Sequence, residues 1–310
     1  MSIAFLFSGQ GAQYPGMMKD IAEKNTDAER VFRIADHTLN RSISGLCFEG
    51  TQEELNLTQN TQPCVLASDL AAYQAVVSAG IKPDAVAGFS LGEYGALVAA
   101  GVIDINDVFP LIQKRAEFMQ EAVPIGQGAM AAVMKLSTGE VENLCNEVDG
   151  YVIPANYNCP GQIVVSGEEK AIDRLIGIAK ERKIKAMKLA VSAPFHCEMM
   201  APAAEKLKQP LAETKFNVPV IPVYMNVDAK PENDPAEIRK KLILQAKSPV
   251  HWEETLRNMA MIGINTFIEL GPGRTLSSFV KKTFGEDVGY FNVTDMETLD
   301  KTVHSVNKEF

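Results

Sequence analysis

Short apolar runs alternate with longer amphipathic stretches along most of the chain. The first run, AFLF, is followed by Ser-Gly-Gln-Gly, which is typical of a buried strand that ends in a tight turn. A long helical pattern is expected to end near Ala122, because Pro124 follows it. Outside residues 128–190, the pattern predicts strands at 3–7, 85–88, 220–226 and 265–270, and helices at 28–39, 63–79 and 93–100.

The segment between residues 128 and 190 has a pattern of its own. Ser137 and Glu140 are spaced as a capping box, which predicts the start of a helix. The predicted order is strand 129–134, helix to 148, strands 151–155 and 162–166, helix 168–182 and strand 184–189. This β-α-β-β-α-β order is that of ferredoxin-like folds. We therefore predict a small ferredoxin-like subdomain at 126–192, inserted into a larger α/β domain formed by residues 1–125 and 193–310.

The composition narrows the class of protein. Of 310 residues, 46% are hydrophobic, which is ordinary for a globular protein, and the net charge of -9 argues against general nucleic-acid binding. No apolar stretch is long enough to span a membrane, and the N-terminal MSIAFLF lacks the basic residues of a signal peptide. Five cysteines without CxxC pairing favour free thiols over disulfides or zinc. We expect a cytoplasmic protein without a nucleic-acid, membrane or metal partner.

The segment Gly88-Phe89-Ser90-Leu91-Gly92 matches the G-x-S-x-G nucleophile elbow. In such an elbow the serine sits on a strained strand-to-helix turn that exposes its Oγ, and the new helix N-terminus favours negative charge there. The motif alone is weak evidence, because chance gives about 0.1 matches in a chain of this length. The alternative interpretation is an ordinary turn that carries an unreactive serine.

A serine hydroxyl needs a base to become a good nucleophile, and the chain has four histidines. His37 and His304 lie in polar stretches, and His251 opens a helical pattern, so all three are expected at the surface or at a helix cap. His196 follows the last strand of the insertion, at its junction with the larger domain, and is the best candidate. Cys197 beside it is interpreted as a small buried residue rather than a nucleophile.

Further motifs accompany the elbow in a fixed order along the chain. They are GQGAQ at 9–13, TQP at 61–63, GFSLGE at 88–93, QKRA at 113–116, GAMAA at 128–132, NYNCPGQ at 156–162, PFH at 194–196 and ELGPG at 269–273. With this series the chain resembles the malonyl-CoA:acyl carrier protein transacylases and the acyltransferase domains of polyketide synthases, over nearly its whole length. The ordered series identifies the family far more specifically than the elbow alone.

The resemblance implies an α/β-hydrolase-like core with an inserted ferredoxin-like subdomain. It implies that Ser90 is the nucleophile and His196 the base. The other implied roles are an oxyanion hole from the backbone N–H groups of Gln10 and Leu91, a carboxylate-binding Arg115, site-lining Gln62 and Asn156, a malonyl-selective Phe195, and a backbone carbonyl of Gln245 that orients the histidine. A carboxylate elsewhere is the alternative partner for the histidine.

The implied reaction moves a malonyl group from malonyl-CoA to the phosphopantetheine thiol of a holo acyl carrier protein, through a malonyl-serine intermediate. It feeds fatty acid biosynthesis, follows ping-pong kinetics and needs no cofactor beyond the two substrates. We expect a monomer. The alternatives are a discrete trans-acting acyltransferase of a polyketide synthase, a serine thioesterase or esterase, which would leave Arg115 unexplained, and a non-catalytic carrier-binding protein.

Two features bear on selectivity and partner binding. Most relatives carry His where this chain has Phe89, which puts the polarity of the pocket and the acyl preference in doubt. Carrier proteins of this family are acidic, as is this chain, so docking is expected to need a basic patch. The candidates are the cluster Lys180, Arg182, Lys183, Lys185 and Lys188, and the pair Lys281 and Lys282; the alternative is an ordinary solvated face.

Overall fold

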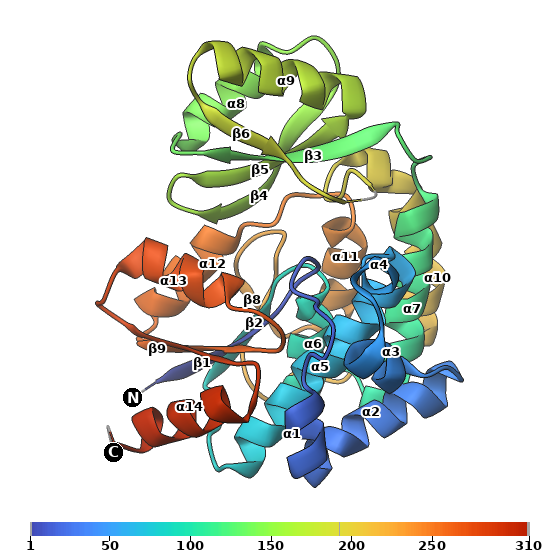
Figure 1. Cartoon of the computed structure of the whole chain (residues 1–310), viewed down its shortest axis with the longest axis vertical. Helices are drawn as coiled ribbons and strands as arrows, with labels where there is room; N and C mark the ends of the chain where they lie inside the picture. The colour runs from blue at the N-terminus through green and yellow to red at the C-terminus, as the bar shows by residue number, and fades with distance from the viewer. Residues whose placement is uncertain (1, 192, 309–310) are drawn as a thin grey trace.

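Two sheets organise the chain, as the computed structural model of residues 2–191 and 193–308 shows (Figure 1). The larger sheet has the strand order β10-β9-β1-β2-β7-β8, and all its pairings are parallel except that of β7 with β8. Its strands are β1 (Ile3–Phe7), β2 (Ala85–Gly88), β7 (Val223–Tyr224), β8 (Pro231–Glu232), β9 (Thr266–Leu270) and β10 (Gly289–Val293).

Helices cover both faces of this sheet, so its central strands are apolar on both sides. In β1, Phe5 and Phe7 belong to one hydrophobic core, while Ala4 and Leu6 belong to another on the opposite face. The helices of the larger part are α1 (Lys19–Lys24), α2 (Thr26–Leu39), α3 (Ile43–Glu49), α4 (Gln52–Leu55), α5 (Thr58–Ser78), α6 (Gly92–Ala99), α7 (Ile105–Glu121), α10 (Ala201–Glu213), α11 (Pro235–Gln245), α12 (Trp252–Met261), α13 (Thr275–Phe284) and α14 (Met296–Lys308).

The smaller sheet is antiparallel and has the order β4-β5-β3-β6. Its helices α8 and α9 lie on the outer face, and the inner face looks toward the larger sheet (Figure 1). Its elements are β3 (Gly128–Met134), α8 (Thr138–Asn146), β4 (Val152–Cys159), β5 (Gln162–Glu168), α9 (Glu169–Glu181) and β6 (Lys185–Lys188). The element order and strand order are those of a ferredoxin-like unit.

The predicted fold class is therefore confirmed: a parallel-sheet α/β core carries a separate antiparallel subdomain. The capping box is also present, since the Ser137 side chain accepts the Glu140 N–H while the Glu140 carboxylate accepts the Ser137 N–H. The exact domain limits stay a prediction, and residue 192 lies outside the described residues. Within the described part of the chain, no helix is both long and apolar enough to cross a membrane.

Three predicted elements differ from the structure by several residues. One is strand β4, which ends at Cys159 rather than at residue 155. Helix α5 begins at Thr58 rather than at residue 63, so Pro63 lies inside it. Pro63 has no N–H for the carbonyl of Gln59, and that carbonyl instead lies 3.5 Å from Arg41 Nη1, which donates to it. The strand predicted at 220–226 is reduced to Val223–Tyr224. The chain turns away beyond it, where the Met225 N–H bonds the Lys230 carbonyl.

Candidate active site

Ser90 lies in a sharp turn between β2 and α6. Its φ of 55° is in the left-handed region, which costs a non-glycine residue about 1–3 kcal/mol. A Cβ on Gly88 would lie 1.9 Å from the Gly92 carbonyl carbon, and a Cβ on Gly92 would lie 2.3 Å from the Phe7 carbonyl oxygen. Both glycines are therefore required for the close packing that presents Ser90 at the carboxyl edge of the sheet.

We predict that Gly88→Ala destabilises the protein by about 3 kcal/mol, because the new methyl group would overlap backbone atoms that cannot move away. The control is Gly177→Ala in α9, where no atom lies within 4 Å of the new Cβ and a helical alanine should stabilise by about 0.5–1 kcal/mol. Denaturant unfolding measures both. Equal stability of the two variants would contradict the close packing of the elbow.

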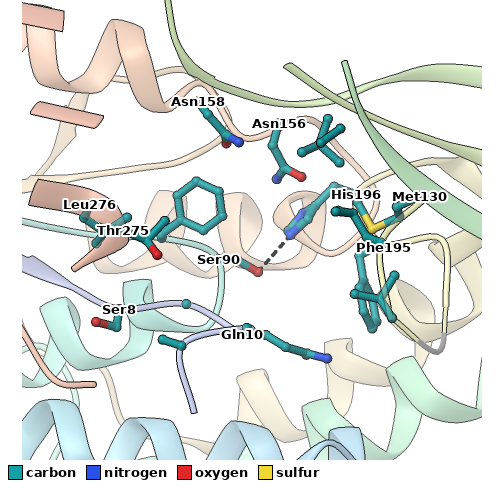
Figure 2. Close-up of a pocket in the computed structure, with 18 of the residues that line it drawn as sticks. Ser8, Gln10, Ser90, Met130, Asn156, Asn158, Phe195, His196, Thr275 and Leu276 are labelled. Carbon is teal, nitrogen blue, oxygen red and sulfur yellow. Dashed lines mark hydrogen bonds between the residues drawn. The ribbon is translucent and has the colours of Figure 1, made fainter. Parts of the chain in front are cut away.

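His196 connects Ser90 to the end of α11. Its Nε2 lies 2.8 Å from Ser90 Oγ (Figure 2). Its Nδ1 lies 2.9 Å from the backbone oxygen of Gln245. A carbonyl can only accept, so Nδ1 carries the proton and Nε2 presents its lone pair to the hydroxyl. This arrangement can activate a serine without a carboxylate behind the histidine. The backbone carbonyl, rather than a carboxylate elsewhere, is thus the partner found for Nδ1.

The pKa of His196 is lowered to about 4, because burial and then the nearby Arg115 charge disfavour the imidazolium, although carbonyl contacts oppose this. A base must be neutral to accept the serine proton. We therefore predict that kcat/KM for serine acylation stays high as pH falls through 6.5 and declines only near pH 4. Initial rates between pH 4 and 8 measure this. A half-maximal rate near pH 6.5 would show that His196 titrates with an ordinary pKa.

Arg115 comes from the middle of α7 and is only 1% exposed. Its Nη2 donates to Ser90 Oγ at 3.2 Å and to Gln245 Oε1 at 2.9 Å, and its Nη1 donates to Gln62 Oε1 at 2.6 Å. The guanidinium also lies 5.5 Å from the centroid of the Tyr94 ring. All three hydrogen-bond acceptors are uncharged. A buried cation held by neutral groups next to the serine is well prepared for an anionic group on a ligand.

Gln10 lines the same cavity as Ser90, and Leu91 follows Ser90 in the chain. The backbone N–H groups of Gln10 and Leu91 have no acceptor among the described residues. Leu91 is the N-cap of α6, so its N–H belongs to the positive end of that helix. The loop that carries Gln10 packs on the elbow, since a Cβ on Gly9 would lie 2.8 Å from the Phe89 ring. Two unengaged N–H groups placed in this way can stabilise an oxyanion.

A cavity of about 260 Å³ lies between the two sheets, in front of Ser90 (Figure 2). Its lining brings together most of the residues that the sequence singled out, but it does not include Leu91 and Gln245. The predicted residues in the lining are Gln10, Gln62, Ser90, Arg115, Asn156, Phe195 and His196. The cavity thus draws on both the larger sheet and the small subdomain.

Phe89 also lines this cavity. Its ring packs edge-on against Trp252, with centroids 5.3 Å apart, and lies 6.4 Å from the ring of Phe279. Phe89, where the family resemblance led us to expect a histidine, therefore makes this wall of the cavity apolar. Its effect on acyl preference stays a prediction.

Sequence reasoning missed two buried polar residues at the elbow, Asn226 and Glu93. Asn226 Oδ1 accepts the Ser90 N–H at 2.7 Å, and the Asn226 N–H donates to Glu93 Oε2 at 2.6 Å. Burial raises the pKa of Glu93 to about 8, although Arg115 and hydrogen bonds oppose this. One feature of the sequence could have indicated Asn226: it lies just after the strand that pairs with β2. Polar residues at the carboxyl ends of parallel strands often line or support a binding site.

The chain is similar to known proteins over nearly its whole length. The acyl transferase domain family matches residues 4–304. A malonyl CoA-acyl carrier protein transacylase of Bacillus subtilis is 44% identical over 311 residues, which covers 99% of this chain and 98% of the relative. The crystal structure of such a transacylase from Clostridium perfringens, 39% identical, superimposes with a TM-score of 0.96 and covers 100% of this chain and 98% of its own.

A further solved structure contains a type II polyketide synthase acyl-carrier protein in complex with its malonyl-transacylase. It is 38% identical to this chain, has a TM-score of 0.95, and covers 98% of this chain and 100% of its own. The chain is thus similar, over almost its full length, to enzymes that are named for malonyl transfer and to one that is seen with its carrier.

Proposed function

Because this chain belongs to the acyl transferase domain family, we infer that it moves a malonyl group from malonyl-CoA to the phosphopantetheine thiol of an acyl carrier protein. Its relatives are named for this reaction over nearly the whole length of the chain. The site geometry supports the same reaction through a malonyl-serine intermediate.

The first half-reaction begins when His196 Nε2 takes the proton of Ser90 Oγ, and Oγ attacks the thioester carbonyl carbon. The N–H groups of Leu91 and Gln10 stabilise the negative oxygen that forms. The carbon–sulfur bond then breaks, and coenzyme A leaves with the proton held by His196. In the second half-reaction His196 deprotonates the phosphopantetheine thiol, the thiolate attacks the ester, and Ser90 recovers its proton.

The position of Arg115 is the observation that carries the assignment. Its guanidinium nitrogen lies 3.2 Å from the nucleophilic oxygen, inside the cavity, where an acyl group on Ser90 would be placed. A cation there can bind the free carboxylate of a malonyl group, which an acetyl group lacks. A thioesterase or esterase would share the elbow and the histidine but would leave this buried charge without a purpose.

The test is incubation of the protein with malonyl-CoA, followed by intact-mass measurement and addition of a holo acyl carrier protein. We expect a malonyl adduct on the protein that disappears as malonyl-carrier forms. Rapid release of free malonate without transfer would instead identify a hydrolase. Absence of any adduct, with a folded protein, would favour a non-catalytic carrier-binding role.

A second candidate is a discrete acyltransferase that serves a polyketide synthase. The neighbour solved with a type II polyketide synthase carrier favours considering it. Transfer rates to a fatty acid carrier and to a polyketide carrier, measured side by side, distinguish the two.

We propose in addition that the protein acts in the cytoplasm as a monomer and needs no cofactor. Acyl transfer between a serine and two thiols requires neither electrons nor phosphate, so both substrates together supply every atom of the reaction. The five free cysteines are all buried, which suits a reducing compartment.

We propose that the carrier docks on a part of the small subdomain. Within the predicted basic cluster, Arg182 pairs with Glu147, and Lys188 pairs with Glu169 and Asp173. Lys183 and Lys185 are exposed and make no such pair among the described residues.

Lys185 is the member of the cluster best placed for this role. It stands opposite Met134, which in turn stands opposite Gln162, a residue of the cavity lining. Directly opposed residues project to the same face of a sheet, so Lys185 faces the side of the cavity.

We predict that reversing the charge of Lys183 and Lys185 to Glu raises the KM for the carrier about 5–10-fold and leaves malonyl loading from coenzyme A intact. Added salt should shrink the difference, because it screens the attraction. The control is the same charge change at Lys24 of α1 and Lys82 after α5, both exposed. Unchanged carrier kinetics in the Lys183 and Lys185 variant would show that the cluster is only a solvated face.

A further inference from the structure

The mechanism above depends on Ser90 being held in a conformation that an ordinary residue adopts rarely, at φ 55°. We propose that Asn226 is the positioning residue that holds it there. Asn226 is fully buried, and the cavity lining does not include it, so it acts on the reaction through the elbow and not by contact with a substrate. The proposal concerns the geometry of the nucleophile, and it rests on the proposed function only for the choice of the malonyl substrate.

The carboxamide of Asn226 bridges the two sides of the elbow. Its Oδ1 accepts the Ser90 N–H at 2.7 Å, and its Nδ2 donates to the Gly88 carbonyl, also at 2.7 Å. These two backbone groups flank Phe89, at the turn where the strand ladder has ended and the helix has not begun. A primary amide offers one acceptor and one donor side by side, which is what this pair of backbone groups requires.

Asn226 is itself fixed from two directions. Its N–H donates to Glu93 Oε2 at 2.6 Å, and Glu93 lies in the first turn of α6, just beyond the elbow. Its carbonyl accepts the His251 N–H at 3.0 Å. A carboxamide anchored by its own backbone on both sides can hold the elbow without swinging away.

The His251 contact also extends the network to the small subdomain. Val250, the residue before His251, bonds to β4, since its N–H donates to the Ala155 carbonyl and its carbonyl accepts the Tyr157 N–H. The strand that carries Asn156 into the cavity and the turn that carries Ser90 are therefore connected through the Asn226 backbone.

The two hydrogen bonds of the Asn226 carboxamide also determine which N–H groups are available to the reaction. The Ser90 N–H is occupied by Asn226, whereas the Leu91 N–H has no acceptor among the described residues. Without the carboxamide, the peptide on either side of Phe89 could rotate, and both the Oγ direction and the Leu91 N–H direction would change. Loss of Asn226 should therefore slow acylation and leave substrate binding nearly unchanged.

The experiment compares Asn226→Ala and Asn226→Asp with a matched control, Asn258→Ala, which removes an asparagine bonded to the Ala229 carbonyl at 2.9 Å away from the elbow. Single-turnover acylation by malonyl-CoA and labelling of Ser90 by a fluorophosphonate probe are measured, together with Tm. We expect Asn226→Ala to lower both rate constants at least 100-fold, with less than a threefold change in the half-saturating malonyl-CoA concentration. Asn226→Asp keeps the acceptor and loses the donor, so we expect about a tenfold loss.

Acylation within threefold of wild type in folded Asn226→Ala would overturn the proposal, as would an equal loss in Asn258→Ala at equal Tm. If Asn226→Ala does not fold, an acylation rate in Asn226→Asp equal to that of wild type would also overturn the proposal. Failure of the proposed function is distinguishable, because wild-type protein would then react with the fluorophosphonate and form no malonyl adduct. The probe reaction would still decide the role of Asn226.

Discussion

Ser90→Ala should abolish the malonyl adduct and lower transfer from malonyl-CoA to the carrier at least 10⁴-fold, in the range known for loss of a covalent nucleophile. The reason is that the ping-pong mechanism requires an acyl-enzyme intermediate, and Ser90 Oγ is the atom that forms it. Without Oγ, the acyl group would have to pass directly between two thiols, both of which would need the same cavity of about 260 Å³ at once. Intact mass after incubation with malonyl-CoA, and steady-state transfer rates, measure the two effects.

Ser68→Ala is the matched control for this variant. Ser68 is also buried, and its Oγ donates to the Cys64 carbonyl at 2.9 Å within α5. This change should leave the adduct intact, because the Ser68 hydroxyl bonds within α5 and does not line the cavity. An adduct of undiminished amount in Ser90→Ala would place the acyl group on another nucleophile, and Cys197 beside the histidine would be examined first.

Arg115→Ala should lower malonyl loading about 100-fold and leave acetyl loading within threefold of wild type, or improve it. Among the described residues that line the cavity, Arg115 is the only lysine or arginine, and a cation can bind the carboxylate that distinguishes malonyl from acetyl. Arg115→Lys should recover only part of the loss, since an ammonium cannot form the paired hydrogen bonds of a guanidinium. Loading rates with malonyl-CoA and acetyl-CoA, measured on the same preparations, give the selectivity ratio.

Removing Arg115 also leaves the oxygens of Gln62 and Gln245 without their donor, so stability must be followed in parallel. Arg239→Ala provides the control. Arg239 is a half-buried arginine outside the cavity lining; it donates to the Leu211 carbonyl at 3.1 Å and lies 4.5 Å from the Phe216 ring centroid. Equal losses for both acyl groups in Arg115→Ala would mean that the residue supports the site in general and does not select malonyl.

The architecture could be predicted well from the sequence, because most helices and strands follow from the pattern of apolar and polar residues within each segment. The short buried runs of β3 and β5, the capping box at Ser137, and the strand–helix order of residues 128–190 depend on near neighbours. The predicted ends of helices were wrong where a tertiary contact outweighs a local sequence rule. Pro63 predicts a helix start, but Arg41 binds the carbonyl that Pro63 leaves free, and the helix extends to Thr58.

For the candidate site, too, one part could be predicted from the sequence and another part required the tertiary structure. The residue types at the elbow, and their order with Arg115 and His196, were sufficient for the sequence to indicate an acyl transferase that works through Ser90. Only the tertiary structure brought His196 within 2.8 Å of Ser90 Oγ and Arg115 within 3.2 Å of it, across separations of 106 and 25 residues. It alone revealed Asn226, because a side chain that bonds backbone groups 136 and 138 residues away leaves no periodic signal in the chain.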